Sequence, residues 1–184
     1  MNLANKITVL RVLMIPAFLA PLLMDAPFGL SAQNARWLAA AIFIMASATD
    51  ILDGWLARKY NMITDFGKFM DPLADKLLVM AALIVLVAKH DIYSWVVILI
   101  LAREFVISGF RMVAASKNIV IAAGIWGKLK TVSQMIMIIL LLIGAQNPLF
   151  LAVGRVLIYL SAALTVISAV DYIAKNISVL KENV

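Results

Sequence analysis

Cysteine is absent from this chain, and histidine occurs once in its 184 residues. Without cysteine the chain has neither disulfides nor thiolate chemistry. A single histidine also argues against a zinc or iron site, because those metals favour sulfur and imidazole ligands. Charged side chains are scarce as well, at 14% of all residues. Any metal site in this protein is therefore expected to use oxygen ligands.

Most of the chain consists of hydrophobic residues. They make up 65% of the chain, and the mean hydropathy is +1.03, whereas a soluble domain is about 45–50% apolar. The apolar residues form runs of about 20, which suit membrane helices rather than the alternating strands of a barrel. We predict an all-α integral membrane protein in which residues 1–184 form a single domain.

Six apolar segments are separated by short polar breaks. A bundle of six transmembrane helices is therefore expected, with each boundary placed by the change in polarity. The predicted spans are 7–24, 34–57, 72–89, 92–115, 129–145 and 149–173.

The basic residues predict how this bundle is oriented. An even number of spans puts both termini on one side, and that side collects thirteen Lys and Arg residues. The other side has three, which are Arg36, Lys89 and Arg155. Basic residues favour the cytoplasmic side, so both termini are expected there. The net charge of +6 is explained by these flanking residues without any nucleic-acid partner. Compact size and the lack of targeting extensions favour a bacterial inner (plasma) membrane.

Four carboxylates stand out against this apolar background. Asp50 and Asp53 are three residues apart near the end of the second span, and Asp71 and Asp75 are four apart near the start of the third. On a helix, both spacings put the pair on one face. Pro72 is expected in the first turn of the third span. Since the spans are joined by a short loop, all four carboxylates are expected to converge near the cytoplasmic surface.

Four converging carboxylates need counter-charge. An ionised side chain in the middle of a membrane costs about 2.5–3.5 kcal/mol, so these groups must lie near water or be neutralised by cations. Carboxylate oxygens suit Mg²⁺ or Mn²⁺, and two such ions would balance four negative charges. Small residues between the acids either admit a bulky ligand or mediate helix packing. Acids in membrane helices also occur in ion and proton transporters, which is the alternative reading.

The whole stretch resembles the signature of the CDP-alcohol phosphotransferase family, with all eight of its positions filled. The pattern in this chain is Asp50-x2-Asp53-Gly54-x2-Ala57-Arg58-x8-Gly67-x3-Asp71-x3-Asp75. Members of that family use an alcohol hydroxyl to displace CMP from a CDP-linked donor. The six-span layout agrees with this resemblance over the whole chain.

The resemblance implies a role for each signature residue. Asp50, Asp53, Asp71 and Asp75 would hold two divalent ions, Mg²⁺ or Mn²⁺, on the donor pyrophosphate. Asp75 would also be the general base. The opening segment, with Asn5-Lys-Ile-Thr8, is similar to that of the family as well. The residues implied to bind the CDP-linked donor are Asn5, Thr8, Gly54, Ala57, Arg58 and Gly67.

A basic cluster in the second half of the chain bears on the acceptor. Arg103 and Arg111 are eight residues apart, about two helical turns, and Lys128 and Lys130 begin the fifth span. Such a cluster suits an acceptor that carries its own phosphate. Arg103-Glu104-Phe and Gly-Lys128-Leu-Lys130-Thr also resemble the branch of the family that joins sn-glycerol 3-phosphate to CDP-diacylglycerol. The alternative is that these are lipid-facing topology charges that reach for the surface.

The expected partners are therefore CDP-diacylglycerol, sn-glycerol 3-phosphate and membrane lipids, and the resemblance also implies a homodimer. Within the family, inositol phosphate, serine and phosphatidylglycerol remain alternative acceptors. Outside it, an ion or proton transporter and a catalytically silent scaffold remain. A transporter would never release CMP, and a scaffold would tolerate Asp50→Asn.

Overall fold

The computed structural model is all-helical in the residues that it describes. These form α1 (Leu3–Leu23), α2 (Ala32–Lys59), α3 (Asp65–Ala88), α4 (Ser94–Ser116), α5 (Ile125–Ile143) and α6 (Pro148–Asn176). The described residues are 3–24, 29–59, 65–117, 119, 121–122, 124–144 and 147–177. Within these ranges, the side chains of 3–8, 50–59, 65–72 and 75 lie outside the description.

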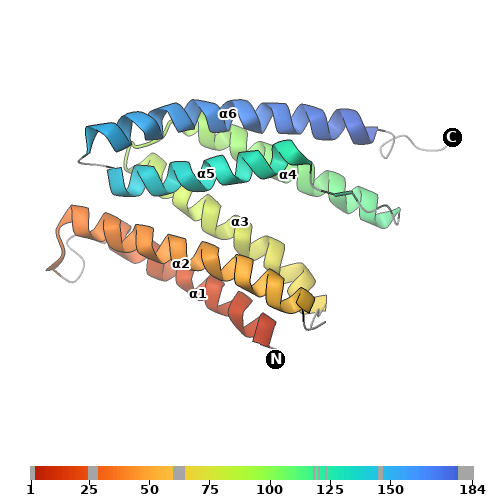
Figure 1. Cartoon of the computed structure of the whole chain (residues 1–184), viewed down its shortest axis with the longest axis horizontal. Helices are drawn as coiled ribbons and strands as arrows, with labels where there is room; N and C mark the ends of the chain where they lie inside the picture. Colours follow the sequence, from red (N-terminus) through yellow and green to blue (C-terminus); the bar gives the residue numbers. More distant parts are fainter. Residues whose placement is uncertain are drawn as a thin grey trace.

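The helices pack as an antiparallel bundle. α1 packs along α2 and α3, and α5 packs along α6 and against α2, while α4 packs against α6 and α3. Figure 1 shows α3 lying between the α1–α2 pair and the α5–α6 pair. Consecutive helices run in opposite directions, so the N-terminus of α1 and the C-terminus of α6 both lie towards the right of the view (Figure 1). The all-helical fold predicted from the apolar runs is confirmed for the described residues.

Several helices extend beyond the apolar runs that predicted them. α3 begins at Asp65 and not at residue 72, and α5 begins at Ile125 and not at residue 129. Apolar runs mark the part of a helix that avoids water, whereas a helix continues into polar residues as long as its backbone hydrogen bonds continue. The prediction that Pro72 lies in the first turn is therefore wrong, because α3 starts seven residues earlier.

The main core joins all six helices through buried apolar side chains, with Ile158 as a member from α6. The Phe18 ring of α1 contacts the Phe43 ring of α2, with ring centroids 5.9 Å apart. Leu83 of α3, Ile100 of α4 and Met137 of α5 are each at most 1% exposed and belong to the same cluster. Burial of such a side chain stabilises the fold by about 1.5–3 kcal/mol. This core holds the helices in place relative to one another, and so positions the polar side chains that they carry.

The start of α6 is fixed by a helix cap. The Asn147 side chain accepts hydrogen bonds from the backbone N–H groups of Leu149, at 3.0 Å, and Phe150, at 3.4 Å. Pro148 occupies the first helical position, where its missing N–H costs little. The cap satisfies backbone donors that would otherwise lack a partner. The break predicted at this point of the sequence is thus a specific helix start.

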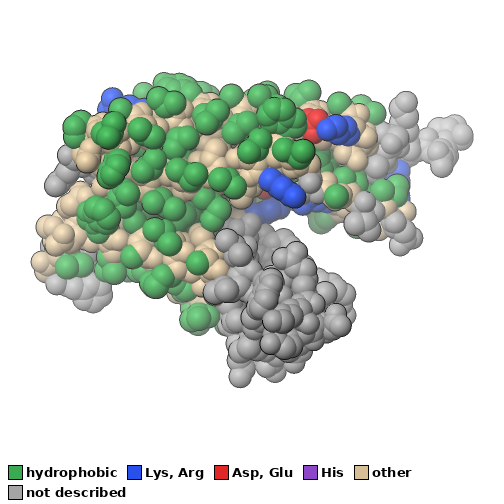
Figure 2. Space-filling view, in the orientation of Figure 1, with side chains coloured by type: hydrophobic (Ala, Val, Ile, Leu, Met, Phe, Trp, Pro, Cys, Tyr) green, Lys and Arg blue, Asp and Glu red, His purple; other side chains and the backbone are tan. Residues whose placement is uncertain are grey.

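The outer surface of the bundle is apolar. Phe105, Met112, Ile125 and Val156 are each between 67% and 75% exposed. Figure 2 shows hydrophobic side chains over much of the described face, while Lys and Arg gather towards the C-terminal end of α6. Soluble proteins rarely expose apolar patches of this extent. In the described part of the chain, α5 and α6 are long and apolar enough to cross a membrane.

Gly144→Ala is expected to destabilise the α5–α6 turn. A Cβ at position 144 would lie 2.9 Å from the Phe150 Cβ, next to the backbone of α6. Overpacking of this kind costs about 1–3 kcal/mol. Gly109→Ala is the matched control, because no atom lies within 4 Å of its Cβ position and alanine favours a helix. Thermal unfolding in detergent micelles should show a lower Tm for Gly144→Ala alone, and equal Tm values would contradict this packing.

Candidate functional site

The four signature aspartates lie on two consecutive helices. Asp50 and Asp53 belong to the C-terminal third of α2, and Asp71 and Asp75 belong to the first half of α3. The two helices contact each other. The side chains of Asp50, Asp53, Asp71 and Asp75 lie outside the described residues. Their convergence on two metal ions therefore stays a prediction.

The residues expected to bind the CDP-linked donor are likewise placed by their backbone alone. They belong to the helical residues of α1, α2 and α3, but their side chains lie outside the description. These residues are Asn5, Thr8, Gly54, Ala57, Arg58 and Gly67. Among the side chains that are described, no group of three His, Asp or Glu residues could hold a metal ion.

A basic cavity lies among α3, α4, α5 and α6. Its volume is about 560 Å³, within the range of about 300–1,000 Å³ that is typical for small-molecule sites. Four cations and two carboxylates line it, so its formal charge is positive. The charged lining residues are Lys76, Arg103, Arg111, Lys128, Glu104 and Asp171. Of the residues predicted to bind an acceptor phosphate, Arg103, Arg111 and Lys128 thus share one cavity.

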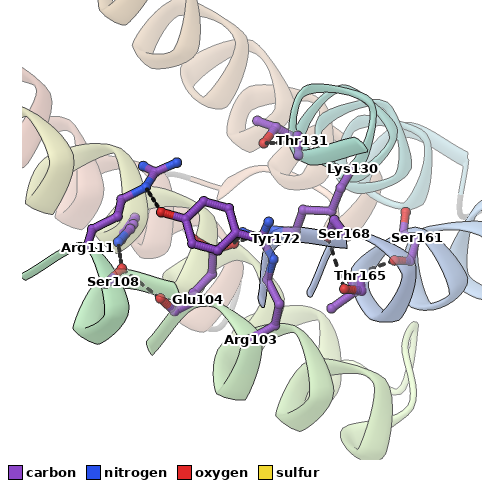
Figure 3. A network of polar contacts seen from close by, with 12 residues as sticks. Arg103, Glu104, Ser108, Arg111, Lys130, Thr131, Ser161, Thr165, Ser168 and Tyr172 are labelled. Carbon is purple, nitrogen blue, oxygen red and sulfur yellow. Dashed lines mark hydrogen bonds and ion pairs between the residues drawn. The ribbon is translucent and has the colours of Figure 1, made fainter. Parts of the chain in front are cut away.

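Arg111 is held in place by Tyr172 of α6. The Arg111 Nε donates a hydrogen bond to the Tyr172 hydroxyl at 3.3 Å, and the guanidinium carbon lies 5.6 Å from the centre of the ring. Tyr172 is buried, and its ring meets Phe110 edge-on at 5.8 Å. Figure 3 shows Tyr172 between Arg111 and the residues of α5. Among the described residues, Nε makes the hydrogen bond of Arg111, so both terminal nitrogens can face a ligand.

Glu104 connects one basic residue of α4 with one of α5. Its Oε1 atom accepts hydrogen bonds from Arg103 Nη1 at 3.0 Å and from Lys130 Nζ at 2.5 Å (Figure 3). The side chains of Arg103 and Glu104 are 11% and 20% exposed. This shared carboxylate holds two cations from neighbouring helices close together in an environment with little water.

Lys130 lies behind the basic cavity. It is 3% exposed, whereas Lys128 at the start of the same helix is exposed. Lys130 lines a smaller neighbouring cavity of about 50 Å³ together with Glu104 and Gln134. Two lysines that are equivalent in the sequence pattern therefore occupy different environments, one at the cavity and one beneath it.

Lys76 also lines the basic cavity, although its place in the sequence predicts only one of the thirteen basic residues that set topology. Its Nζ donates a hydrogen bond to the Ser108 hydroxyl of α4, and that hydroxyl donates to the backbone oxygen of Glu104 at 2.6 Å. Lys76 lines both cavities and directly follows Asp75 in α3. The sequence feature that could have indicated a functional role for Lys76 is its position next to Asp75. Tyr172 carried no such signal, since its role depends on how α4 and α6 pack.

Glu104→Gln is expected to destabilise the bundle. The amide cannot neutralise Arg103 and Lys130. Removing one partner of a buried ion pair costs about 3–5 kcal/mol, and the cost is smaller here because the Glu104 side chain is 20% exposed. Asp91→Asn is the matched control, because Asp91 contacts a single cation, Arg36, at 2.8 Å. Thermal unfolding in micelles should show the larger decrease in Tm for Glu104→Gln. An unchanged Tm would mean that Glu104 does not hold this cluster together.

The family and the relatives of this chain agree with the signature. The family model for CDP-alcohol phosphatidyltransferases matches residues 1–167. A Bacillus subtilis protein named CDP-diacylglycerol–glycerol-3-phosphate 3-phosphatidyltransferase is 43% identical, covering 98% of this chain and 97% of its own. A Rickettsia bellii protein of the same name is 38% identical and covers 93% of each chain. A probable phosphatidylglycerophosphate synthase of Mycobacterium tuberculosis is 41% identical, over 95% of this chain and 81% of its own.

Proposed function

This chain belongs to the CDP-alcohol phosphatidyltransferase family, and from that premise we propose that it makes phosphatidylglycerophosphate. It is an enzyme that transfers the phosphatidyl group from CDP-diacylglycerol to sn-glycerol 3-phosphate and releases CMP. The observation that carries the choice of acceptor is the basic cavity, in which four cations surround a space of about 560 Å³.

The basic cavity is the acceptor site in this proposal. Glycerol 3-phosphate is small and carries a phosphate with close to two negative charges. Arg111 offers two terminal nitrogens to that phosphate, and Arg103 is held at the cavity by Glu104. Lys128 adds a charge at the exposed edge of the cavity, and Lys130 supports Arg103 through the carboxylate that they share. Serine or a zwitterionic acceptor would leave these cations uncompensated.

The donor site is assigned to the signature of α2 and α3. The carboxylates of Asp50, Asp53, Asp71 and Asp75 form a donor set of hard oxygens that fits Mg²⁺ or Mn²⁺. When bound, two such ions supply charge stabilisation for the phosphoryl oxygens and the leaving CMP. Arg58 contacts the donor phosphates, Gly54, Ala57 and Gly67 give room to the nucleotide, and Asn5 and Thr8 contact the cytosine or ribose.

Asp75 is the general base of the transfer. It takes the proton of the glycerol 3-phosphate hydroxyl as that oxygen forms a bond to the phosphatidyl phosphorus. The phosphoanhydride bond to CMP breaks, and its electron pair leaves with CMP. Lys76, the next residue of α3, lines the acceptor cavity. The predicted base and the acceptor cavity are therefore adjacent along one helix.

The chain forms one domain with six transmembrane helices, and both termini face the cytoplasm of a bacterial inner membrane. The apolar outer surface and the thirteen-to-three distribution of basic residues support this arrangement. The basic cavity then opens towards the cytosol, the source of glycerol 3-phosphate, while the acyl chains of the donor stay in the bilayer. A homodimer is the expected assembly.

The product distinguishes this reaction from its alternatives. Purified protein in micelles is supplied with CDP-diacylglycerol, Mg²⁺ and sn-glycerol 3-phosphate labelled in its glycerol carbons. The label is expected in the lipid phase as phosphatidylglycerophosphate, in an amount equal to the CMP released. CMP release without label in the lipid phase would mean that water or another acceptor is used, and would contradict the proposed acceptor.

A further inference from the structure

A second polar cavity lies at the opposite end of α6 from the acceptor cavity. It has a volume of about 490 Å³ and lies between the starts of α2 and α6 and the turn that joins α3 to α4. Arg155 at this cavity and Asp171 at the acceptor cavity are sixteen residues apart on α6. That separation corresponds to about 24 Å along a helix axis, close to the thickness of the hydrocarbon layer. Figure 1 shows α6 running the length of the bundle between these two ends.

The charges around this second cavity leave a net positive group at its edge. Arg36 donates a hydrogen bond to Asp91 at 2.8 Å, so these two charges neutralise each other. Arg155 is exposed and has no carboxylate within 4 Å among the described residues. His90 adds a polar ring from the α3–α4 turn. With Asp91 paired to Arg36, the charged side chains that line the cavity leave a formal charge of +1, carried by Arg155.

The base of the second cavity is apolar. Ile92 and Ile158 are 5% and 1% exposed, and Leu151 lies beside them. Tyr93 forms part of the rim, and its ring centroid lies 6.4 Å from that of Tyr159. Tyrosines with one polar end are typical of the membrane–water interface. A ligand with a charged group next to hydrocarbon matches this lining better than a fully solvated ion.

The distribution of basic residues points to the same place. This end of the bundle holds three of the sixteen Lys and Arg residues, namely Arg36, Lys89 and Arg155. Two of the three line the second cavity, and Lys89 does not. Topology selects against basic residues on this side, so Arg155, whose charge no described carboxylate neutralises, points to a ligand that requires it.

We propose that this second cavity binds the phosphate of an anionic phospholipid, with Arg155 as its main contact. The phosphate lies against the guanidinium of Arg155, Arg36 contributes from its ion pair with Asp91, and the glycerol end of the lipid packs on Ile92 and Ile158. A guanidinium suits the phosphate of a headgroup, and the apolar base of the cavity suits the hydrocarbon next to it. The site is separate from the substrates of the proposed reaction and does not depend on it.

The experiment measures lipid binding through thermal stability. The full-length protein in neutral detergent micelles is titrated with phosphatidylglycerol, with phosphatidylcholine or with inorganic phosphate. The variants are Arg155→Gln, Arg155→Lys and Lys89→Gln, of which the last removes an exposed cation from the same end outside the cavity. Phosphatidylglycerol is expected to raise the Tm, with an apparent affinity that falls about 5–10-fold in Arg155→Gln. That affinity should stay unchanged in Lys89→Gln and be largely retained in Arg155→Lys.

Three results would overturn the proposal. An equal loss in Arg155→Gln and Lys89→Gln would show attraction to surface charge in general. An Arg155-dependent effect with phosphatidylcholine as large as that with phosphatidylglycerol would remove the requirement for an anionic lipid. An Arg155-dependent effect with inorganic phosphate and none with phosphatidylglycerol would assign the cavity to a soluble anion. Because the Arg155 side chain is exposed, an unchanged Tm in the absence of added lipid serves as the check that each variant is folded.

Discussion

Asp75→Asn is expected to reduce CMP release by about 10³-fold or more, the largest effect of any single substitution in this chain. The variant loses the general base, which contributes about 10²–10⁴-fold in enzymes of known mechanism. It also removes one of four carboxylates from the predicted metal site, so the two losses combine. The amide has nearly the same shape as the carboxylate, and the fold should therefore be retained.

The position of Asp75 makes this prediction specific. Its neighbour Lys76 contacts Ser108 of α4 and lines the acceptor cavity. Asp91→Asn is the control, because it makes the same chemical change just beyond the other end of α3, where the carboxylate pairs with Arg36. CMP release is measured for both variants at several Mg²⁺ concentrations. The assignment of Asp75 as the base fails if Asp75→Asn keeps more than about a tenth of the wild-type rate. A loss of less than about tenfold is smaller than the contribution of a general base.

Arg111→Ala is expected to raise the KM for glycerol 3-phosphate about 10–100-fold and to leave the KM for CDP-diacylglycerol unchanged. A hydrogen bond between charged groups contributes about 1.5–3 kcal/mol, which corresponds to this factor. Arg111 is suited to this role because Tyr172 holds its Nε and leaves the terminal nitrogens for the ligand. Steady-state kinetics with each substrate varied in turn would measure the two KM values separately.

Two further variants test whether Arg111 acts by binding the acceptor or by packing against its neighbours. Tyr172→Phe keeps the ring beneath Arg111 but removes the hydroxyl that accepts its hydrogen bond at 3.3 Å. It should raise the same KM by a smaller factor, since the arginine remains but is less well oriented. Lys89→Ala removes an exposed cation at the far end of the bundle and should change neither KM. An equal change in both KM values in Arg111→Ala would indicate a general loss of structure instead.

The sequence was sufficient for the helices and for the family. Runs of apolar residues marked all six helices, because a helix in contact with hydrocarbon needs predominantly apolar side chains. The same signal misplaced the start of α3, since residues 65–71 are helical although charged residues interrupt their apolar ones. The signature from Asp50 to Asp75 identified the family because its residue types and spacing are seldom combined by chance.

The acceptor cavity could be predicted only in part. Cations are rare in apolar segments, so those that occur there stand out in the sequence. This is why binding of the acceptor phosphate could be predicted for Arg103, Arg111 and Lys128. The difference in exposure between Lys128 and Lys130 could not be predicted, because the burial of Lys130 against Glu104 depends on how α4 and α5 meet. Tyr172 was missed for the same reason: nothing near it in the sequence indicates that the packing of α6 brings it to Arg111. Contacts between helices are decided by packing, which the order of residues along one helix does not reveal.

The most direct test of the proposed function is CMP release from CDP-diacylglycerol by the purified protein in micelles, with Mg²⁺ or Mn²⁺ and one acceptor at a time. The acceptors are sn-glycerol 3-phosphate, inositol 1-phosphate, serine and phosphatidylglycerol. We expect metal-dependent release with glycerol 3-phosphate alone, and its loss on addition of a chelator. Release with a different acceptor would contradict the role given to the basic cavity. A folded protein that releases no CMP with any acceptor would contradict the proposed reaction itself.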